Sequence, residues 1–302
     1  MNNQLLDSNR IGGIKSLFYK ELQEHYPDAE IGIFFRLMME HFFGIRLVDY
    51  IHNHERRLSE SEIVTVFKII RKLKRQVPWQ YIVGETEFWG LTIRVNESVL
   101  IPRPETEELV AMIAEHYQSK SKPKRIIDLC SGSGCIALSL KKIFPDAEVI
   151  GIEISSEAIE IARINAAQNK LDVAFIHADL MDASYFNDFL PFDLIVSNPP
   201  YIADAEKSGM ESNVLDHEPP LALFVPDKDP LIFYKTIAGM TDKYLKESGE
   251  IWLEINSALA KETKSVFATL NAELLLDISG KNRFLVATQK PLTRTFKALP
   301  DA

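Results

Sequence analysis

Segments that favour β-strands alternate with segments that favour α-helices through the second half of this 302-residue chain, and this alternation constrains the fold most strongly. The predicted strands are residues 125–129, 148–153, 173–176, 192–197 and 250–255, and the predicted helices are residues 134–142, 156–168, 230–245 and 259–270. Repeated strand–helix units indicate an α/β fold with a doubly wound parallel sheet. Two further β-rich segments, residues 274–278 and 283–288, predict an antiparallel terminal hairpin at one edge of that sheet.

The first 75 residues lack this alternation and favour helices. Ser59 and Glu62 fit a capping box, in which each side chain accepts a hydrogen bond from a backbone N–H at the start of a helix. In the helix that follows, apolar residues share one face and basic residues the opposite face: Ile63, Val66, Phe67, Ile70 and Leu73, against Lys68, Arg71, Lys72 and Arg75. The apolar face predicts the core of a small helical bundle, and we interpret the basic face as solvated surface rather than a docking face.

The chain is predicted to divide into three parts. Residues 1–75 form the helical domain, residues 76–100 a β-hairpin linker, and residues 101–302 the α/β domain. Pro78 ends the helical region, and the β-formers and glycines of residues 80–95 predict the hairpin.

Cysteine content and hydropathy exclude several classes of protein. The chain has only two cysteines, Cys130 and Cys135, and no second Cys/His pair near them, so neither a disulfide scaffold nor a metal site is expected. No apolar run approaches the ~18 residues of a membrane span, and the first residues lack the pattern of a secretory signal. We therefore expect a cytoplasmic protein that does not contact membranes.

Charge is unevenly distributed along the chain, whose net charge is −9. Residues 1–80 hold 12 basic and 10 acidic side chains, and the remainder holds 22 and 33. An acidic main body is a poor partner for duplex nucleic acid, whose affinity comes largely from phosphate contacts, so direct nucleic-acid binding is not expected. The helical part has a positive balance and no catalytic constellation, so we expect it to dock a substrate.

A doubly wound sheet binds ligands at the carboxyl ends of its strands, and the first predicted strand ends in a turn of small residues. The candidate ligand-binding residues of this turn are Asp128, Cys130, Ser131, Gly132, Ser133 and Gly134. Glycines lack the Cβ that would keep a ligand from the backbone. Such turns occur in many nucleotide sites and also as simple turns, and no Gly-Lys-Ser/Thr follows to make a phosphate-binding loop.

Acidic residues follow the next two predicted strands. Glu153 ends its strand 25 residues after Asp128, and a carboxylate there can accept both hydroxyls of a ribose. Asp179 and Leu180 follow the third strand. The Asp179 carboxylate suits either an adenine amino group or the cap of a helix.

The fourth strand end carries the most informative turn, Asn198, Pro199, Pro200 and Tyr201. Asn198 offers both an acceptor and a donor, and the two prolines stiffen the turn and leave backbone carbonyls exposed. Tyr201 offers a flat wall. A planar amide or amine fits this arrangement, with its N–H groups received by Asn198 and the Pro199 carbonyl.

Together, these motifs resemble the class I S-adenosylmethionine-dependent methyltransferases that modify planar amide or amino nitrogens. A narrower resemblance, over essentially the whole chain, is to the release factor glutamine methyltransferases (the PrmC/HemK family). It rests on residues 78–84 (Pro-Trp-Gln-Tyr-Ile-Val-Gly), on residues 99–110, which include Pro-Arg-Pro-Glu-Thr-Glu, and on Glu218-Pro219 followed by Ala222-Leu223.

The resemblance implies a Rossmann-like methyltransferase sheet, S-adenosylmethionine as cofactor, and the glutamine of the Gly-Gly-Gln motif in peptide chain release factors as substrate. Cofactor contacts would fall on residues 130–134, Glu153, Asp179, Leu180 and Asn198. Substrate contacts would fall on residues 198–201, with Asn198, Pro199 and Tyr201 as the catalytic residues. Cys130 replaces a glycine common in methyltransferases, and close approach of the cofactor survives if its φ is negative.

A monomer is expected, and two other functions stay open. The Asn-Pro-Pro-Tyr turn also suits methylation of adenine amino groups in nucleic acid, although the acidic catalytic part disfavours that substrate. The other alternative is a catalytically silent module that binds the cofactor and acts through its helical domain.

Overall fold

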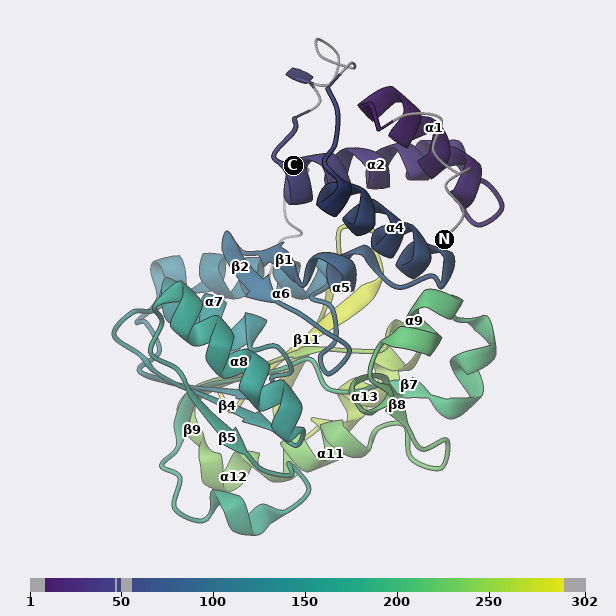
Figure 1. Ribbon diagram of the computed structural model, residues 1–302. Helices are drawn as coiled ribbons and strands as arrows, with labels where there is room; N and C mark the ends of the chain where they lie inside the picture. The colour runs from purple at the N-terminus through teal and green to yellow at the C-terminus, as the bar shows by residue number, and fades with distance from the viewer. Residues whose placement is uncertain (1–8, 47, 50–55, 291–302) are drawn as a thin grey trace. The chain divides into compact units, whose positions relative to one another are not determined.

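The protein's structure is a computed structural model that describes residues 9–46, 48–49 and 56–290, and the chain divides into two compact units. The first unit comprises Met1–Gly84 together with Ser212–His217, and the second comprises Glu85–Glu211 and Glu218–Ala302. Figure 1 shows both units, with most of their helices and strands labelled.

The first unit is helical, as predicted. Its helices are α1 (Ile11–Leu22), α2 (Asp28–Phe43), α4 (Glu60–Lys74), α5 (Trp79–Val83) and α9 (Ser212–His217). Helix α1 packs against α2 and α4, and its Phe18 ring meets Phe35 edge-on at 5.7 Å. The capping box is confirmed: the Ser59 backbone N–H donates to Glu62 Oε2 at 2.7 Å, and the Glu62 N–H donates to Ser59 Oγ at 3.3 Å.

The predicted hairpin is correct for its second half and wrong for its first. Residues 79–83 form α5, which starts after Pro78 and ends at Gly84, where φ is 88°. Strands β1 (Glu85–Phe88) and β2 (Leu91–Arg94) then form the hairpin. Its two turn residues, Trp89 and Gly90, both have positive φ, which the tight turns of two-residue hairpins require.

The second unit is built on a seven-stranded sheet with the order β10-β11-β9-β6-β3-β4-β5. The strands are β3 (Arg125–Leu129), β4 (Glu148–Glu153), β5 (Ala174–His177), β6 (Phe192–Ser197), β9 (Leu245–Glu254), β10 (Asn271–Leu276) and β11 (Asn282–Thr288). Strands β9, β6, β3, β4 and β5 are mutually parallel. The terminal hairpin lies at one edge as predicted, and only β11 runs against the others, because β10 turns back and lies antiparallel to it.

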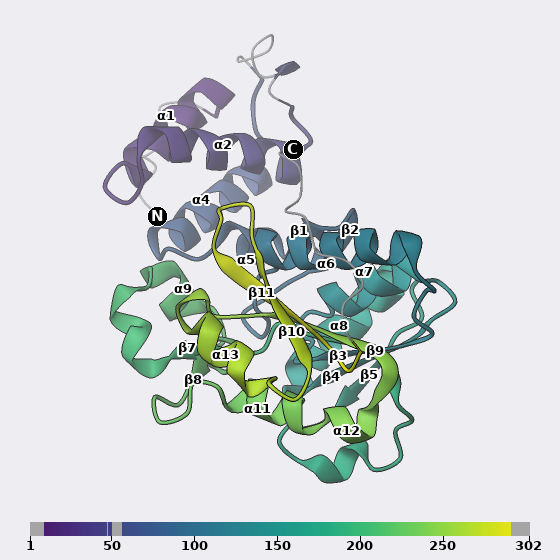
Figure 2. The same cartoon turned by 180° about the vertical axis from the view of Figure 1, so that it is seen from behind.

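Helices cover both faces of the sheet (Figures 1 and 2). The helices of this unit are α6 (Pro104–His116), α7 (Cys135–Ile143), α8 (Ser156–Asn169), α10 (Pro220–Leu223), α11 (Ile232–Gly239), α12 (Thr241–Tyr244) and α13 (Ala260–Val266). Its described residues also form four 3-10 turns, Tyr117–Ser119, Ala183–Phe186, Asp204–Gly209 and Ser257–Leu259, and a short parallel pair, β7 (Ile202–Ala203) and β8 (Phe224–Val225). The predicted helix 230–245 is thus two helices, and Leu245 already belongs to β9.

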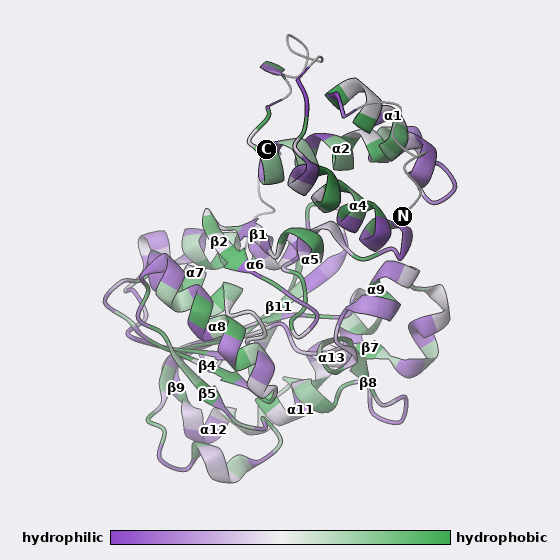
Figure 3. Ribbon diagram, in the orientation of Figure 1, coloured by the Kyte–Doolittle hydropathy of each residue, from purple (hydrophilic) through white to green (hydrophobic). Residues whose placement is uncertain are grey.

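The core lies between the sheet and its helices. Central strands β3 and β6 are almost wholly buried, and green hydrophobic segments are visible in the sheet near β4 and β5 in Figure 3. Side chains alternate between the faces of a strand. On β3, Ile127 and Leu129 join the cluster that includes Tyr234 and Ile237 of α11, whereas Asp128 faces α7. Among the described residues, no helix is long and apolar enough to cross a membrane.

Candidate active site

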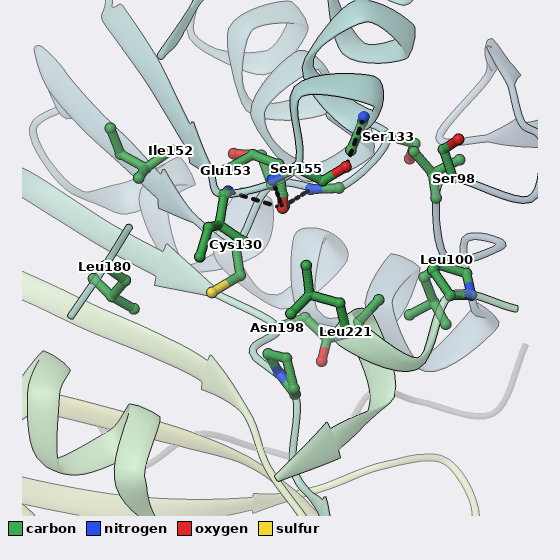
Figure 4. Close-up of a pocket in the computed structure, with 18 of the residues that line it drawn as sticks. Ser98, Leu100, Cys130, Ser133, Ile152, Glu153, Ser155, Leu180, Asn198 and Leu221 are labelled. Carbon is green, nitrogen blue, oxygen red and sulfur yellow. Dashed lines mark hydrogen bonds between the residues drawn. The ribbon is translucent and has the colours of Figure 1, made fainter. Parts of the chain in front are cut away.

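A cavity of about 570 Å³ opens at the carboxyl ends of the parallel strands (Figure 4). Its walls come from the segments that follow four strands: residues 130–133 after β3, 153–155 after β4, 178–181 after β5, and Asn198 with Pro200 after β6. Strand β3 has β4 on one side and β6 on the other, so the chain order reverses here, and doubly wound sheets bind ligands at such a point. The structure therefore brings together most of the predicted site residues.

The glycine-rich turn after β3 is fixed by its own backbone. The Ser131 N–H donates to the Ile152 carbonyl at 2.9 Å, and the Gly134 N–H donates to the Ser131 carbonyl at 2.8 Å. Gly132 lines the cavity, and a Cβ added there would meet no protein atom within 4 Å. Gly134 instead lies against the protein, because a Cβ there would come within 2.6 Å of Phe175.

The backbone of Cys130 does not have the negative φ that close approach of the cofactor was expected to require. Its φ is +61°, in the left-handed region that disfavours residues with a Cβ, so the expectation of a negative φ is wrong. Such a conformation costs on the order of 1–3 kcal/mol and persists only where the surroundings enforce it. Burial raises the pKa of the Cys130 thiol well above its usual value, and the neighbouring Glu153 raises it further. Cys130 therefore lines the cavity as a neutral thiol.

Glu153 lines the cavity and is held by three backbone N–H groups. Its Oε2 accepts from Gly132 at 2.9 Å, and its Oε1 accepts from Ile154 at 2.9 Å and Ser155 at 3.0 Å. A carboxylate offers about four acceptor sites, so roughly one remains for a ligand hydroxyl. The expected contact with both hydroxyls of a ribose requires one of these backbone bonds to be exchanged.

Glu153→Ala is expected to weaken binding of S-adenosylmethionine by about 1.5–3 kcal/mol, the value of a hydrogen bond to a charged group, while the fold stays intact. Isothermal titration calorimetry measures the dissociation constant. Glu148→Ala, at the opposite end of β4 and exposed, serves as the control and should bind normally. An unchanged dissociation constant for Glu153→Ala would refute a contact between this carboxylate and the ribose.

Asp128 does not line the cavity. It is fully buried, and its Oδ2 accepts from the Ala137 N–H at 3.1 Å near the start of α7. Its Oδ1 has no hydrogen-bond partner, and burial raises its pKa to about 8. The structure thus places Asp128 beneath the glycine-rich turn, where it supports the turn and does not reach a ligand.

Asp179 and Leu180 lie at the cavity wall after β5. The Asp179 Oδ1 accepts from the Met181 N–H at 2.8 Å, so one oxygen holds the local turn. Leu180 is buried and gives this part of the wall an apolar surface. Both roles considered for Asp179, local cap and ligand acceptor, fit this position.

The turn after β6 divides its residues between the cavity and the core. Asn198 and Pro200 line the cavity, whereas Pro199 and Tyr201 are not part of its lining. The Tyr201 ring packs against the hydrophobic core, and its hydroxyl donates to Glu254 Oε1 at 3.1 Å. Burial and the nearby Glu254 raise the Tyr201 pKa, so the hydroxyl stays protonated. The prediction that the Tyr201 ring forms a flat wall for the substrate is therefore not met in this cavity, because the ring is not part of its lining.

The sequence assigned no role to Thr106 and Glu254, but in the structure they fix Asn198: Thr106 lines the cavity beside Asn198, and Glu254 holds Thr106. The Asn198 Nδ2 donates to Thr106 Oγ1 at 3.0 Å, and Thr106 Oγ1 donates to Glu254 Oε2 at 2.7 Å. Glu254 is buried, which raises its pKa, while the hydrogen bonds from Thr106 and Tyr201 act in the opposite direction. Thr106 belongs to the Pro-Arg-Pro-Glu-Thr-Glu segment, so the sequence held a signal for it, but Glu254 ends a strand without any motif.

Arg103 and Glu107 of that segment, and Glu108 directly after it, each reach a different element. Arg103 pairs with the buried Glu218 at 2.6 Å, Glu107 accepts from the Trp89 N–H at 2.8 Å in the β1–β2 turn, and Glu108 accepts from the Ile278 N–H at 3.0 Å after β10. Pro104 begins α6, where a proline is favoured. Arg103, Thr106 and Glu107 of the segment thus each have a separate partner in the fold.

The residues after Glu218 form a further wall that our sequence reasoning left without a role. Glu218 Oε2 accepts from the Ile101 N–H at 3.3 Å, and residues 219–222 line the cavity together with Arg103. The Arg103–Glu218 pair thus fixes two loops of the second unit against each other at the edge of the cavity.

Comparison with known proteins agrees with this geometry. A family model described as "Methyltransferase small domain" matches residues 106–275, and one described as "PrmC N-terminal domain" matches residues 17–84. A release factor glutamine methyltransferase from Flavobacterium psychrophilum is 39% identical over 91% of this chain and 98% of its own length. Those from Bacteroides thetaiotaomicron (39% identical, 91% of this chain, 99% of that protein) and Streptococcus pneumoniae (36%, 92% and 98%) are similar over comparable spans. The chain therefore belongs to the release factor glutamine methyltransferase family.

Proposed function

We propose that this protein transfers a methyl group from S-adenosylmethionine to the side-chain amide nitrogen of the glutamine in the Gly-Gly-Gln motif of peptide chain release factors. The observation that carries the proposal is the position of Asn198 at the edge of the cavity. Its Nδ2 is held by Thr106, while its Oδ1 has no hydrogen-bond partner among the described residues and stays accessible. An amide N–H of a substrate is the natural donor to that oxygen.

The residues of the cavity fit S-adenosylmethionine. Its volume lies within the roughly 300–1,000 Å³ typical of small-molecule sites. Glu153 and Asp179 offer acceptors to hydroxyl and amino groups, Leu180 offers an apolar wall, and Gly132 leaves open space beside the backbone. Carboxylates also suit a ligand that carries a positive charge. When bound, the cofactor supplies a methyl group activated by a positively charged sulfur.

The protein's contribution to the reaction is to orient a poor nucleophile. The lone pair of a glutamine side-chain nitrogen is delocalised into its carbonyl group, so the nitrogen must be held in line with the methyl group. We infer that the Asn198 Oδ1 and the Pro199 carbonyl oxygen accept the two amide hydrogens. Pro199 is not among the residues that line the cavity, but its neighbours Asn198 and Pro200 are, and no hydrogen bond between described residues uses its carbonyl oxygen. Positioning of this kind supplies up to roughly 7–11 kcal/mol, and acceptors near the nitrogen favour its developing positive charge.

Radiolabelled methyl transfer tests the proposal. The purified protein is incubated with S-adenosylmethionine labelled in its methyl group and with a peptide chain release factor, and mass spectrometry locates the product. One added methyl group on the glutamine of the Gly-Gly-Gln peptide is expected. A release factor whose motif glutamine is replaced by glutamate should remain unlabelled and serves as the control.

The same assay separates the two alternative functions. Transfer to DNA or RNA in place of the release factor would identify an adenine amino-group methyltransferase. Binding of the cofactor without transfer to any substrate would identify a silent binding module. The accessible Asn198 oxygen favours a catalyst, because a module that only binds the cofactor has no use for it.

The helical first unit is proposed to dock the release factor. A chain that begins at Glu85 should bind S-adenosylmethionine with unchanged affinity, because every residue that lines the cavity belongs to the second unit. It should lose most of its activity on intact release factor. A short Gly-Gly-Gln peptide is the matched substrate, and both chains should methylate it equally. Equal rates on intact release factor would contradict the docking role.

The remaining expectations concern the protein's oligomeric state, its localisation and its binding partners. We propose that the protein acts as a monomer in the cytoplasm and recognises the release factor without direct contact to nucleic acid or membranes. The support is the acidic balance of residues 81–302 and the placement of the whole cavity within one unit. Analytical ultracentrifugation with and without the release factor measures the oligomeric state.

A further inference from the structure

We propose that Glu254 and Thr106 are positioning residues that fix which atom of the Asn198 amide faces the cavity. The inference rests on the function proposed above and names the part of the protein that determines how Asn198 acts. Neither residue touches the substrate in this scheme. Both act through Asn198: Thr106, which lies in the cavity wall beside it, accepts a hydrogen bond from its amide, and Glu254, outside the cavity lining, accepts one from Thr106.

Three elements distant in sequence bring these side chains together. Asn198 follows β6, Glu254 ends β9, and Thr106 lies in the first turn of α6. Strands β6 and β9 are parallel with Ser197 opposite Leu253, so Asn198 and Glu254 come next to each other at the same end of the sheet. The Thr106 hydroxyl links them through hydrogen bonds of 3.0 Å and 2.7 Å.

Counting hydrogens determines the direction of this chain. Both carboxyl oxygens of Glu254 accept hydrogen bonds, Oε2 from Thr106 and Oε1 from Tyr201, and a threonine hydroxyl has a single hydrogen to donate. Because Thr106 gives its hydrogen to Glu254, its oxygen can only accept from Asn198. Asn198 must therefore turn its Nδ2 toward Thr106, and its Oδ1 toward the cavity.

The opposite orientation would oppose the reaction. With the amide of Asn198 reversed, its NH₂ group would face the NH₂ group of the substrate glutamine, and two donors would meet. Removing the Thr106 hydroxyl leaves nothing in this chain of contacts that distinguishes the two orientations. Thr106 and Glu254 thus favour the orientation that can hold the acceptor nitrogen.

Burial keeps this arrangement from being replaced by water. Thr106 is 3% exposed and Glu254 is 2% exposed. The second carboxylate oxygen of Glu254 accepts from the Tyr201 hydroxyl, so Glu254 holds both ends of the turn at residues 198–201. The Tyr234 hydroxyl donates to the Glu254 backbone carbonyl at 3.3 Å and fixes the same residue from the core side.

Thr106→Val tests the proposal because it keeps the side-chain shape and removes the hydroxyl. We expect the single-turnover rate of methyl transfer to fall about tenfold or more, the loss typical of removing an outer partner that orients a functional group. The dissociation constant for S-adenosylmethionine should stay within about twofold of wild type, below the tenfold that ~1.4 kcal/mol would give. Thr106→Ser restores the hydroxyl and should restore the rate. Thr241→Val is the matched control, since this buried threonine donates to the Ala238 carbonyl at 2.8 Å away from the cavity.

A double-mutant cycle with Asn198→Ala separates positioning from general structural support. If Thr106 acts through Asn198, adding Thr106→Val to Asn198→Ala should lower the rate no further. Glu254→Gln, which replaces one acceptor oxygen by a donor, should behave like Thr106→Val in the same cycle. An equal loss with and without the Asn198 amide would overturn the inference, as would a Thr106→Val enzyme with the wild-type rate. Absence of transfer by the wild-type protein would instead count against the proposed function itself.

Discussion

Replacing Asn198 with alanine is expected to lower the turnover of methyl transfer at least ~100-fold, the loss typical of removing one preorganised polar contact. The variant loses the accessible Oδ1 at the edge of the cavity, and with it one of the two acceptors for the substrate amide. Affinity for S-adenosylmethionine should change only modestly, because Glu153 and the turn at residues 130–134 remain. Single-turnover rates with saturating cofactor and release factor give the measurement.

Asn198→Asp is the stricter variant. It keeps an oxygen acceptor and adds a negative charge beside the positively charged sulfur, which favours the ground state over a transition state in which that charge is dispersed. The structure adds a second penalty, because residue 198 would then share the single Thr106 hydrogen with the carboxylate of Glu254. We expect cofactor binding at least as tight as in wild type, together with slow turnover.

Asn271→Ala is the control for both variants. Asn271 lies on the edge strand β10, where its amide donates to backbone carbonyls, and it does not line the cavity. Its removal should leave turnover unchanged. Near-normal rates in Asn198→Ala and Asn198→Asp would show that the Asn-Pro-Pro-Tyr turn has only a structural role.

Gly134→Ala is expected to destabilise the fold by about 2–5 kcal/mol. Two separate costs add at this position. Its φ of +80° disfavours any residue with a Cβ by about 1–2 kcal/mol. The new Cβ would also lie 2.6 Å from Phe175 Cζ, which is itself buried, and overpacking of this kind costs about 1–3 kcal/mol. Urea denaturation followed by circular dichroism measures the change in the free energy of unfolding.

Gly280 offers a matched control with nearly the same backbone. Its φ is +79°, and a Cβ added there would meet nothing within 4 Å. Gly280→Ala should therefore show only the backbone cost of about 1–2 kcal/mol. If the two variants lose equal stability, the contact between residue 134 and Phe175 does not matter. Because the turn at 130–134 would shift to admit the new Cβ, Gly134→Ala should also weaken cofactor binding, whereas Gly280→Ala should not.

The sequence by itself predicted the central sheet well because the relevant patterns are local. The bounds of β3, β4 and β6 agree with prediction, since short buried strands between turn residues and helices leave a clear pattern of hydrophobicity. The capping box at Ser59 agrees for the same reason, as its two partners are three residues apart. The general location of the site followed from topology, because the carboxyl ends of parallel strands meet at one edge of a sheet.

Prediction failed where contacts across the fold override local preference. Residues 79–83 are rich in β-formers yet form α5, in which Trp79 stacks on Phe34 at 5.9 Å and meets Phe42 edge-on at 6.4 Å. Cys130 adopts a positive φ that its residue type disfavours, because the hydrogen bonds of the surrounding turn hold it there.

The sequence by itself therefore determined the α/β sheet, the helical unit and the residue types at each strand end. Only the tertiary structure decided what those residues do. It buried Asp128 beneath the turn, turned the Tyr201 hydroxyl toward the core, and joined Thr106 to Glu254 across 148 residues of chain. The physical reason is that a hydrogen bond between buried side chains depends on where the backbone brings them. The sequence around Thr106 or Glu254 does not indicate which distant residue will be its partner.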